Sequence, residues 1–182
     1  MPFGTPLYTP TYKVVGDEVA VFETTKGTIE ARLDGEGAPI HVANFCELAE
    51  KGFYDGTKFH RFVPNFVIQG GDPNTRDLTS EEVARGGRMG APRPGTGGPG
   101  YCIKAEYATN PNNKHEDAAL AMARSQAPDS AGSQFYFCLG AQHFLDPNYT
   151  VFGQTVAGFD VIKQLRAGDE LVHVTIKHEP RA

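Results

Sequence analysis

Turn-forming residues interrupt this chain at short intervals along most of its length. The 182 residues include 21 glycines and 13 prolines, more than an ordinary globular chain carries and fewer than a disordered or collagen-like one. Both residues end regular elements and favour turns, so they divide the chain into many short segments. Several of these segments are β-prone, which favours strands over long helices. The sequence therefore predicts a mainly β fold.

Two β-prone runs near the start of the chain predict a hairpin. They cover residues 19–24 and 28–33, and Gly27 between them can supply the positive φ that a tight turn requires. Further short runs predict additional strands, at residues 59–63, 66–69, 101–104, 135–139, 151–154 and 171–177.

Two helices are predicted among these strands. Residues 39–51 begin with Pro39, which suits the first helical position, and end before Gly52. Residues 159–165 carry apolar side chains on one helical face and end before Gly168. Many short strands with only two helices favour a closed or nearly closed antiparallel barrel, because closure removes exposed sheet edges.

Three other segments have weaker signals. Residues 1–17 hold several prolines and little periodicity, which predicts an extended arm or a loose tail. Within the turn-rich segment 73–100, Thr79 and Glu82 have the spacing of a capping box and predict a single helical turn. Residues 117–124 favour a helix by propensity but lack a cap, so their conformation stays open.

Charge and cysteine content exclude several classes of partner. The formal net charge of −5 weighs against a protein that binds nucleic acid or anionic lipid. Three separated cysteines, without a CxxC pair, suit reduced thiols better than disulfides. No apolar run is long enough for a membrane span, and the N-terminus lacks the features of a signal peptide. We therefore expect a cytoplasmic protein without membrane or nucleic-acid partners.

Several familiar catalytic patterns fail in this sequence. Residues 95–100 match GxGxxG, but no strand leads into them and no helix follows, so a glycine-rich turn is the better interpretation than a dinucleotide site. Ser133 does not stand in the GxSxG motif of a hydrolase nucleophile, and the histidines show no metal-ligand spacing. We expect no metal and no cofactor.

Two segments, residues 59–72 and 132–137, stand out from this background. Strand alternation places Gln134 and Tyr136 on one face and their phenylalanine neighbours in the core. The same alternation puts Phe66 opposite its neighbour Val67, unless a bend at the preceding residues turns Phe66 outward.

A surface that combines one arginine, two glutamines and several apolar groups could bind an extended peptide containing an apolar residue. Ordinary barrel faces with a scattered arginine account for the same pattern equally well. The residues of these two segments alone leave both interpretations open.

At these segments the sequence resembles a cyclophilin-type peptidyl-prolyl cis/trans isomerase, and its details resemble bacterial members. The runs FHRFVPNFVIQGGDP and GSQFYF are similar to the two signature blocks of the family, and the similarity covers roughly residues 18–178. The resemblance implies a closed eight-stranded antiparallel β-barrel capped by two α-helices, with a peptide groove on its outer face. It also implies an extended arm at residues 1–17 and a cyclophilin-like domain at 18–182, with a loop insertion at about 73–94.

The resemblance assigns roles to particular residues. The positions that match catalytic residues are Arg61, Gln69 and Phe66. The positions that match substrate-binding residues are Val67, Gly95, Ala123, Arg124, Gln134, Tyr136, Phe144, Leu145 and Tyr149.

Some of these positions depart from the residue that is common in the family. Val67 stands where methionine is common, Tyr136 where phenylalanine is, and Arg124 where asparagine is. Phe144 replaces a tryptophan and Tyr149 a histidine, as in bacterial members. Because Phe144 lacks the indole donor, we expect weak cyclosporin binding.

By resemblance, the protein is a monomeric isomerase that acts without a cofactor on Xaa-Pro bonds in peptides and in unfolded or flexible protein segments, assisting their folding. An alternative is a chaperone-like module that binds proline peptides with little or no turnover, which Val67, Tyr136 and the insertion would suit. Arg61 discriminates between them, because a groove without an arginine would favour binding alone.

Overall fold

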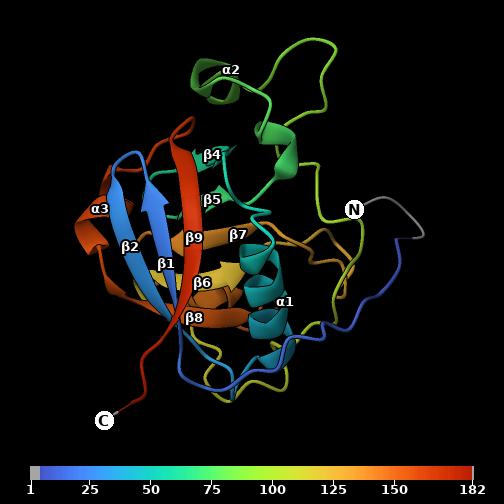
Figure 1. Cartoon of the computed structure of the whole chain (residues 1–182), viewed down its shortest axis with the longest axis vertical. Helices are drawn as coiled ribbons and strands as arrows, with labels where there is room; N and C mark the ends of the chain where they lie inside the picture. Colours follow the sequence, from blue (N-terminus) through green and yellow to red (C-terminus); the bar gives the residue numbers. More distant parts are fainter. Residues whose placement is uncertain (1–4, 182) are drawn as a thin grey trace.

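A computed structural model describes residues 5–181, which form one curled antiparallel sheet with short helices around it (Figure 1). The strands in this part of the chain are β1 (Glu18–Thr24), β2 (Gly27–Leu33), β3 (Thr57–Lys58), β4 (Arg61–Val63), β5 (Val67–Gly70), β6 (Ala119–Met122), β7 (Phe135–Cys138), β8 (Val151–Ala157) and β9 (Glu170–His178). Their order across the sheet is β3-β9-β1-β2-β8-β6-β7-β5-β4. The mainly β prediction is confirmed.

The two ends of this order, β3 and β4, are neighbours in sequence. The residues between them connect the ends of the sheet through backbone hydrogen bonds. The Phe59 N–H donates to the Asp169 carbonyl at 2.9 Å, beside β9, and the His60 N–H donates to the Gln69 carbonyl at 3.0 Å, on β5. The described residues thus form nine strands where eight were expected, and a two-residue link stands where a ladder would close the barrel.

One predicted strand is absent from the structure, and one segment that the sequence left open forms a strand. Residues 101–104 form no strand, because Cys102 and Ile103 make only isolated bridges, to Leu7 and Ala131. The ambiguous segment 117–124 contains strand β6 instead of a helix. All four residues of β6 are buried, between β8 and β7, so sheet pairing overrides the helix propensity of the alanines.

The helices follow the sequence signals closely. They are α1 (Pro39–Glu50), α2 (Ser80–Ala84) and α3 (Phe159–Gln164), with 3-10 turns η1 (Pro73–Thr75) and η2 (His143–Leu145). The capping box of α2 is present, since Thr79 Oγ1 accepts from the Glu82 N–H at 3.1 Å and Glu82 Oε1 accepts from the Thr79 N–H at 2.9 Å. Within residues 5–181 no helix is both long and apolar enough to cross a membrane.

The main core lies inside the curled sheet and is rich in aromatic rings. Phe22 on β1 contacts Phe45 on α1 and both Phe135 and Phe137 on β7, with ring centroids 5.2 to 5.6 Å apart. Helix α1 packs against β9 and α3 against β2, on opposite sides of the view in Figure 1. Of these ring pairs, Phe22–Phe45 joins helix α1 to the sheet.

The opposite face of β5, β6 and β7 carries a second, smaller apolar group. We call it the outer cluster; its buried members are Val67, Ala119, Ala121, Tyr136, Cys138, Leu145 and Val151. Tyr136 lies here while its neighbours Phe135 and Phe137 lie in the core, which confirms the predicted alternation along β7.

The N-terminal arm runs extended along its own domain rather than loosely. Its residues 1–4, like residue 182, lie outside the described part of the chain. The Tyr8 N–H donates to the Cys102 carbonyl at 2.7 Å. The Glu47 carboxylate on α1 accepts from the Tyr8 hydroxyl at 2.9 Å and from the Thr11 and Tyr12 N–H groups. A segment without periodicity gives no sequence signal for such docking.

Candidate active site

A pocket of about 410 Å³ opens on the outer cluster. Its lining residues are His60, Arg61, Phe66, Val67, Gln69, Pro94, Gly95, Ala123, Arg124, Tyr136, Leu145 and Tyr149. The structure therefore brings together nearly all the site residues expected from the sequence. The two others lie beside the pocket, Phe144 stacked on Phe66 and Gln134 bonded to Gln69.

One wall of the pocket is aromatic. Phe66 and Phe144 stack with their ring centroids 5.8 Å apart, and Phe144 is 66% exposed at the rim. Asn65 has a φ of 61°, a left-handed conformation that asparagine tolerates, and this bend precedes the first residue of β5. Strict strand alternation for Phe66 is thus wrong, and the bend turns its ring to the pocket side.

A polar wall begins with Arg61, beside the aromatic one. Arg61 and Gln69 face each other across the β4–β5 ladder, and Arg61 Nη1 donates to Gln69 Oε1 at 3.5 Å. The guanidinium carbon lies 5.7 Å from the centroid of the Phe66 ring. Arg61 makes no ion pair with any described residue, so most of its donors remain available to a ligand.

The two glutamines continue this wall into a second, smaller pocket. Gln69 Nε2 donates to Gln134 Oε1 at 3.1 Å, and Gln134 Nε2 donates to the Gly97 carbonyl at 2.8 Å. The second pocket, about 110 Å³, shares Gln69, Gly95, Ala123 and Arg124 with the first. The two hollows therefore adjoin and form one groove.

Asp72 holds the loop that borders both pockets. Its carboxylate is fully buried and accepts from the Gly95 N–H and, at 2.8 Å, from the Asn74 N–H. Gly95 has a φ of 96°, and a Cβ on Gly97 would lie 2.2 Å from an Asp72 oxygen. Both glycines are needed because the backbone turns tightly against the carboxylate.

Arg124 and Tyr149, two of the family departures, interact with each other. The Arg124 guanidinium carbon lies 4.7 Å from the centroid of the Tyr149 ring, a cation–π contact. Arg124 Nε also donates to the Asn148 carbonyl at 2.9 Å. The arginine is therefore anchored to the loop that carries Tyr149 and does not extend freely into solvent.

Two histidines at the site escaped the sequence analysis. His60 lines the pocket, and its Nδ1 is buried without a hydrogen-bond partner in the described structure. Burial lowers the pKa of His60, against an opposing effect of Asp72, and the charge of Arg61 lowers it further. Its position next to Arg61 in the first signature block was an available signal.

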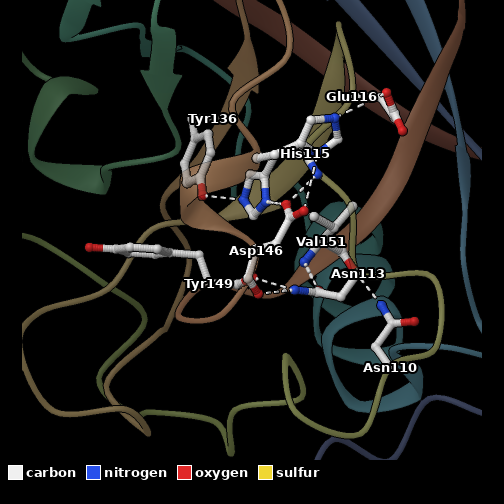
Figure 2. Close-up of polar contacts among 9 residues, drawn as sticks. Asn110, Asn113, His115, Glu116, Tyr136, Asp146, Tyr149 and Val151 are labelled. Carbon is white, nitrogen blue, oxygen red and sulfur yellow. Dashed lines mark hydrogen bonds and ion pairs between the residues drawn. The ribbon is translucent and has the colours of Figure 1, made fainter.

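His115 contacts the Tyr136 hydroxyl, and no pattern in the neighbouring sequence marks it as a site residue. The Tyr136 hydroxyl lies 2.8 Å from His115 Nε2, and His115 Nδ1 lies 2.7 Å from Asp146 Oδ1 (Figure 2). His115 is separated from both partners in sequence and belongs to none of the signature blocks. Only the folded chain places it against the pocket.

A family model for cyclophilin type peptidyl-prolyl cis-trans isomerase/CLD matches residues 19–180. The chain belongs to this family. The peptidyl-prolyl cis-trans isomerase of Synechococcus elongatus is 40% identical over 159 residues, covering 86% of this cyclophilin and 94% of the relative. Peptidyl-prolyl cis-trans isomerase B of Bacillus subtilis is 41% identical over 149 residues, covering 82% and 90% of the two chains. Both relatives are bacterial, as the sequence suggested.

Solved structures show the same fold. The crystal structure of a Cryptosporidium parvum cyclophilin type isomerase superposes with a TM-score of 0.73 at 24% identity, over 90% of this chain and 99% of that one. That protein was also crystallised in the presence of the dipeptide Ala-Pro. The family and its relatives confirm the predicted activity, that of a peptidyl-prolyl cis/trans isomerase.

Proposed function

We propose that this cyclophilin binds Xaa-Pro segments in the groove described above and that Arg61 accelerates rotation about the prolyl bond. The observation that carries the proposal is the position of Arg61, whose guanidinium borders an apolar pocket without an ion-pair partner among the described residues. The crystallisation of a relative of the same fold with Ala-Pro supports a groove for such peptides.

Rotation about a peptide bond faces a barrier of about 18 to 20 kcal/mol, because it disrupts the amide resonance. No covalent bond breaks, so the reaction requires no nucleophile. In the twisted transition state the proline nitrogen regains its lone pair. A donor directed at that nitrogen binds the transition state better than either planar isomer, and Arg61 is positioned to be that donor.

The arginine alone cannot account for the whole rate enhancement. A hydrogen bond to a charged group contributes about 1.5 to 3 kcal/mol, which corresponds to about 10- to 150-fold in rate. We assign the remainder to anchoring of one side of the prolyl bond while the other rotates. Gln69 and Gln134 would hold the substrate backbone, beside Gly95, Ala123 and Arg124.

The apolar pocket would hold the proline ring. Its walls are Phe66, Val67, Tyr136, Leu145 and Tyr149, and Phe144 stacks on Phe66 at its rim. Excluding water there strengthens the hydrogen bond from Arg61, because the local dielectric constant is low. By accepting the proline ring, the pocket would bring the prolyl nitrogen within reach of Arg61.

NMR exchange spectroscopy on a short Ala-Pro peptide tests this proposal. Wild type should accelerate cis/trans exchange, and Arg61→Ala should lose at least about tenfold of that acceleration while keeping its circular dichroism spectrum. Arg61→Lys is the matched control, since it keeps the charge but loses the planar donor pair. Binding by both wild type and Arg61→Ala with no acceleration by either would favour the chaperone-like binding module.

Some expectations about partners and location go beyond the family assignment. We propose that the protein is a cytoplasmic monomer and that it binds cyclosporin weakly, because Phe144 at the pocket rim has no N–H to donate. Titration calorimetry should show tighter cyclosporin binding for Phe144→Trp than for wild type. Sedimentation velocity tests the monomer, and fractionation of the source cells tests the location.

A further inference from the structure

A chain of three buried or half-buried polar groups runs from the proline pocket into the protein. Tyr136 on β7 lines the pocket and is 4% exposed. Its hydroxyl meets Nε2 of His115, whose side chain is fully buried, and Nδ1 of that ring meets the Asp146 carboxylate after η2 (Figure 2). The phenol hydroxyl is therefore bonded to a residue that does not line the pocket.

The partners determine which atom carries each proton. Asp146 Oδ1 also accepts the backbone N–H of His115, at 2.7 Å, so this carboxylate oxygen acts as an acceptor. His115 Nδ1 must then carry the ring proton, and this N–H donates a hydrogen bond to Asp146. Nε2 of the neutral ring is left as an acceptor, and the Tyr136 hydroxyl donates to it.

The electrostatic surroundings agree with this assignment. Burial lowers the pKa of His115 in spite of the opposing hydrogen bond to Asp146, so the ring is neutral at pH 7. Burial alone would raise the pKa of Asp146, but the hydrogen bonds from His115 and His143 lower it overall. Burial raises the pKa of Tyr136, so the phenol keeps its proton.

The residues beside His115 hold another part of the pocket wall. Asn113 Nδ2 donates to the carbonyls of Asp146 and Tyr149, at 2.7 and 2.9 Å. Asn113 Oδ1 accepts the Val151 N–H at 2.8 Å (Figure 2). The loop that carries Leu145 and Tyr149 is thus fixed by the same short segment that holds the Tyr136 hydroxyl.

We propose that His115 is a positioning residue for the isomerase site, which takes the Tyr136 hydroxyl so that only the ring of Tyr136 faces the proline pocket. The inference rests on the proposed role of that pocket. A phenol without this acceptor would have to turn its hydroxyl toward the pocket or draw water to it. Either change places a polar group where the proline ring would pack.

A double-mutant cycle on Ala-Pro exchange tests the proposal. His115→Leu fills most of the imidazole volume without an acceptor, and it should lose about tenfold of the acceleration. Tyr136→Phe has no hydroxyl to satisfy, so its own rate is the reference for the second substitution. The double variant should then return to within about threefold of Tyr136→Phe, because no phenol remains that needs His115.

The matched control is His143→Ala. This variant removes the other imidazole on Asp146, which binds Oδ2 at 3.0 Å and makes no contact with Tyr136. It should keep the wild-type rate. An equal loss in His143→Ala, or a double variant as slow as His115→Leu, would show a merely structural role and overturn the proposal.

A second measurement does not depend on the folding of any variant. Nitrogen-15 NMR of the wild-type protein at neutral pH should show His115 protonated at Nδ1 and unprotonated at Nε2; the opposite tautomer would overturn the proposal. If wild type fails to accelerate exchange, the proposed function fails while the nitrogen spectrum still decides the His115 assignment. If wild type is active and Tyr136→Phe does not rescue His115→Leu, only the positioning role fails.

Discussion

Gln69 holds Arg61 loosely across the β4–β5 ladder, with 3.5 Å between Nη1 and Oε1, and donates through its own amide to Gln134 at 3.1 Å. One glutamine thus connects the arginine to the rest of the groove. The long Arg61 contact restrains the guanidinium without occupying its remaining donors, which suits the donor role that we propose for it.

This relationship predicts an order of effects between the two glutamines. Gln69→Ala removes the contact to Arg61 as well as that to Gln134, and we expect it to lower the exchange rate by about tenfold. Gln134→Ala leaves Arg61 held and should lower the rate by only about threefold. Exchange spectroscopy on the same peptide measures both, and a larger loss for Gln134→Ala would contradict the proposed role of Gln69.

Asp72 should be important for both stability and substrate binding. Asp72→Ala leaves the N–H groups of Asn74 and Gly95 without their acceptor, so we expect the free energy of unfolding to fall by about 1 to 3 kcal/mol. The Michaelis constant should rise, because Gly95 borders both pockets. Urea denaturation and steady-state kinetics check these effects. Asp72→Asn keeps one acceptor oxygen and should show smaller changes; unchanged stability in Asp72→Ala would refute the prediction.

Acid should destabilise the fold through His60 and His115, because the pKa of each is lowered in the folded chain. Burial lowers the pKa of His60 and of His115 below the ordinary value of 6.5. Below pH 6.5 the unfolded chain therefore binds more protons than the folded one, and the free energy of unfolding falls as the pH falls. The slope can reach about 1.4 kcal/mol per pH unit for each histidine.

Urea denaturation between about pH 7.5 and 5.5 measures this slope. His178 is a suitable control, because its hydrogen bond to Asp17 raises its pKa. Protonation of His178 therefore stabilises the folded state as the pH falls, the opposite of the effect of His60 and His115. His178→Ala should therefore not reduce the acid destabilisation. Constant stability over this pH range would show that the two histidines titrate normally in the fold.

The long loop after η1 should divide into a structural part and a dispensable tip. Leu78 and Val83 are buried, whereas Met89 at the tip is fully exposed. Val83→Ala should lower the free energy of unfolding by about 1 to 2 kcal/mol through lost burial. Replacing residues 86–91 by a short glycine-serine linker should change it by less than about 0.5 kcal/mol. Thermal unfolding of both variants measures this difference. Equal losses of stability in the two variants would disprove the division of the loop.

The sequence predicted the elements whose signals are local. Helix α1 has Pro39 at its start and Gly52 after its end, and the α2 turn has its capping box, so neighbouring residues sufficed. Strand β6 could not be predicted in this way. Its alanines favour a helix in isolation, and only pairing with β7 and β8 makes them a strand.

The same distinction applies to the site. Arg61, Phe66 and Gln69 are close in sequence and lie within one signature block, so the resemblance placed them together. From the sequence, the hydroxyl of Tyr136 is only a departure from the phenylalanine that is common at this position in the family. The structure directs that hydroxyl to His115, through a contact between residues distant in sequence that no local pattern reports.

We expect local opening of the sheet to begin at the link between β3 and β4, the strand that carries Arg61. Phe59 and His60 connect the two ends of the sheet by few backbone bonds, and Arg61 follows directly after them. Local opening of a sheet is least costly where the fewest bonds must break. Amide hydrogen exchange at Phe59 and His60 would therefore report the motions that displace the guanidinium, and heating should slow turnover before the sheet as a whole unfolds.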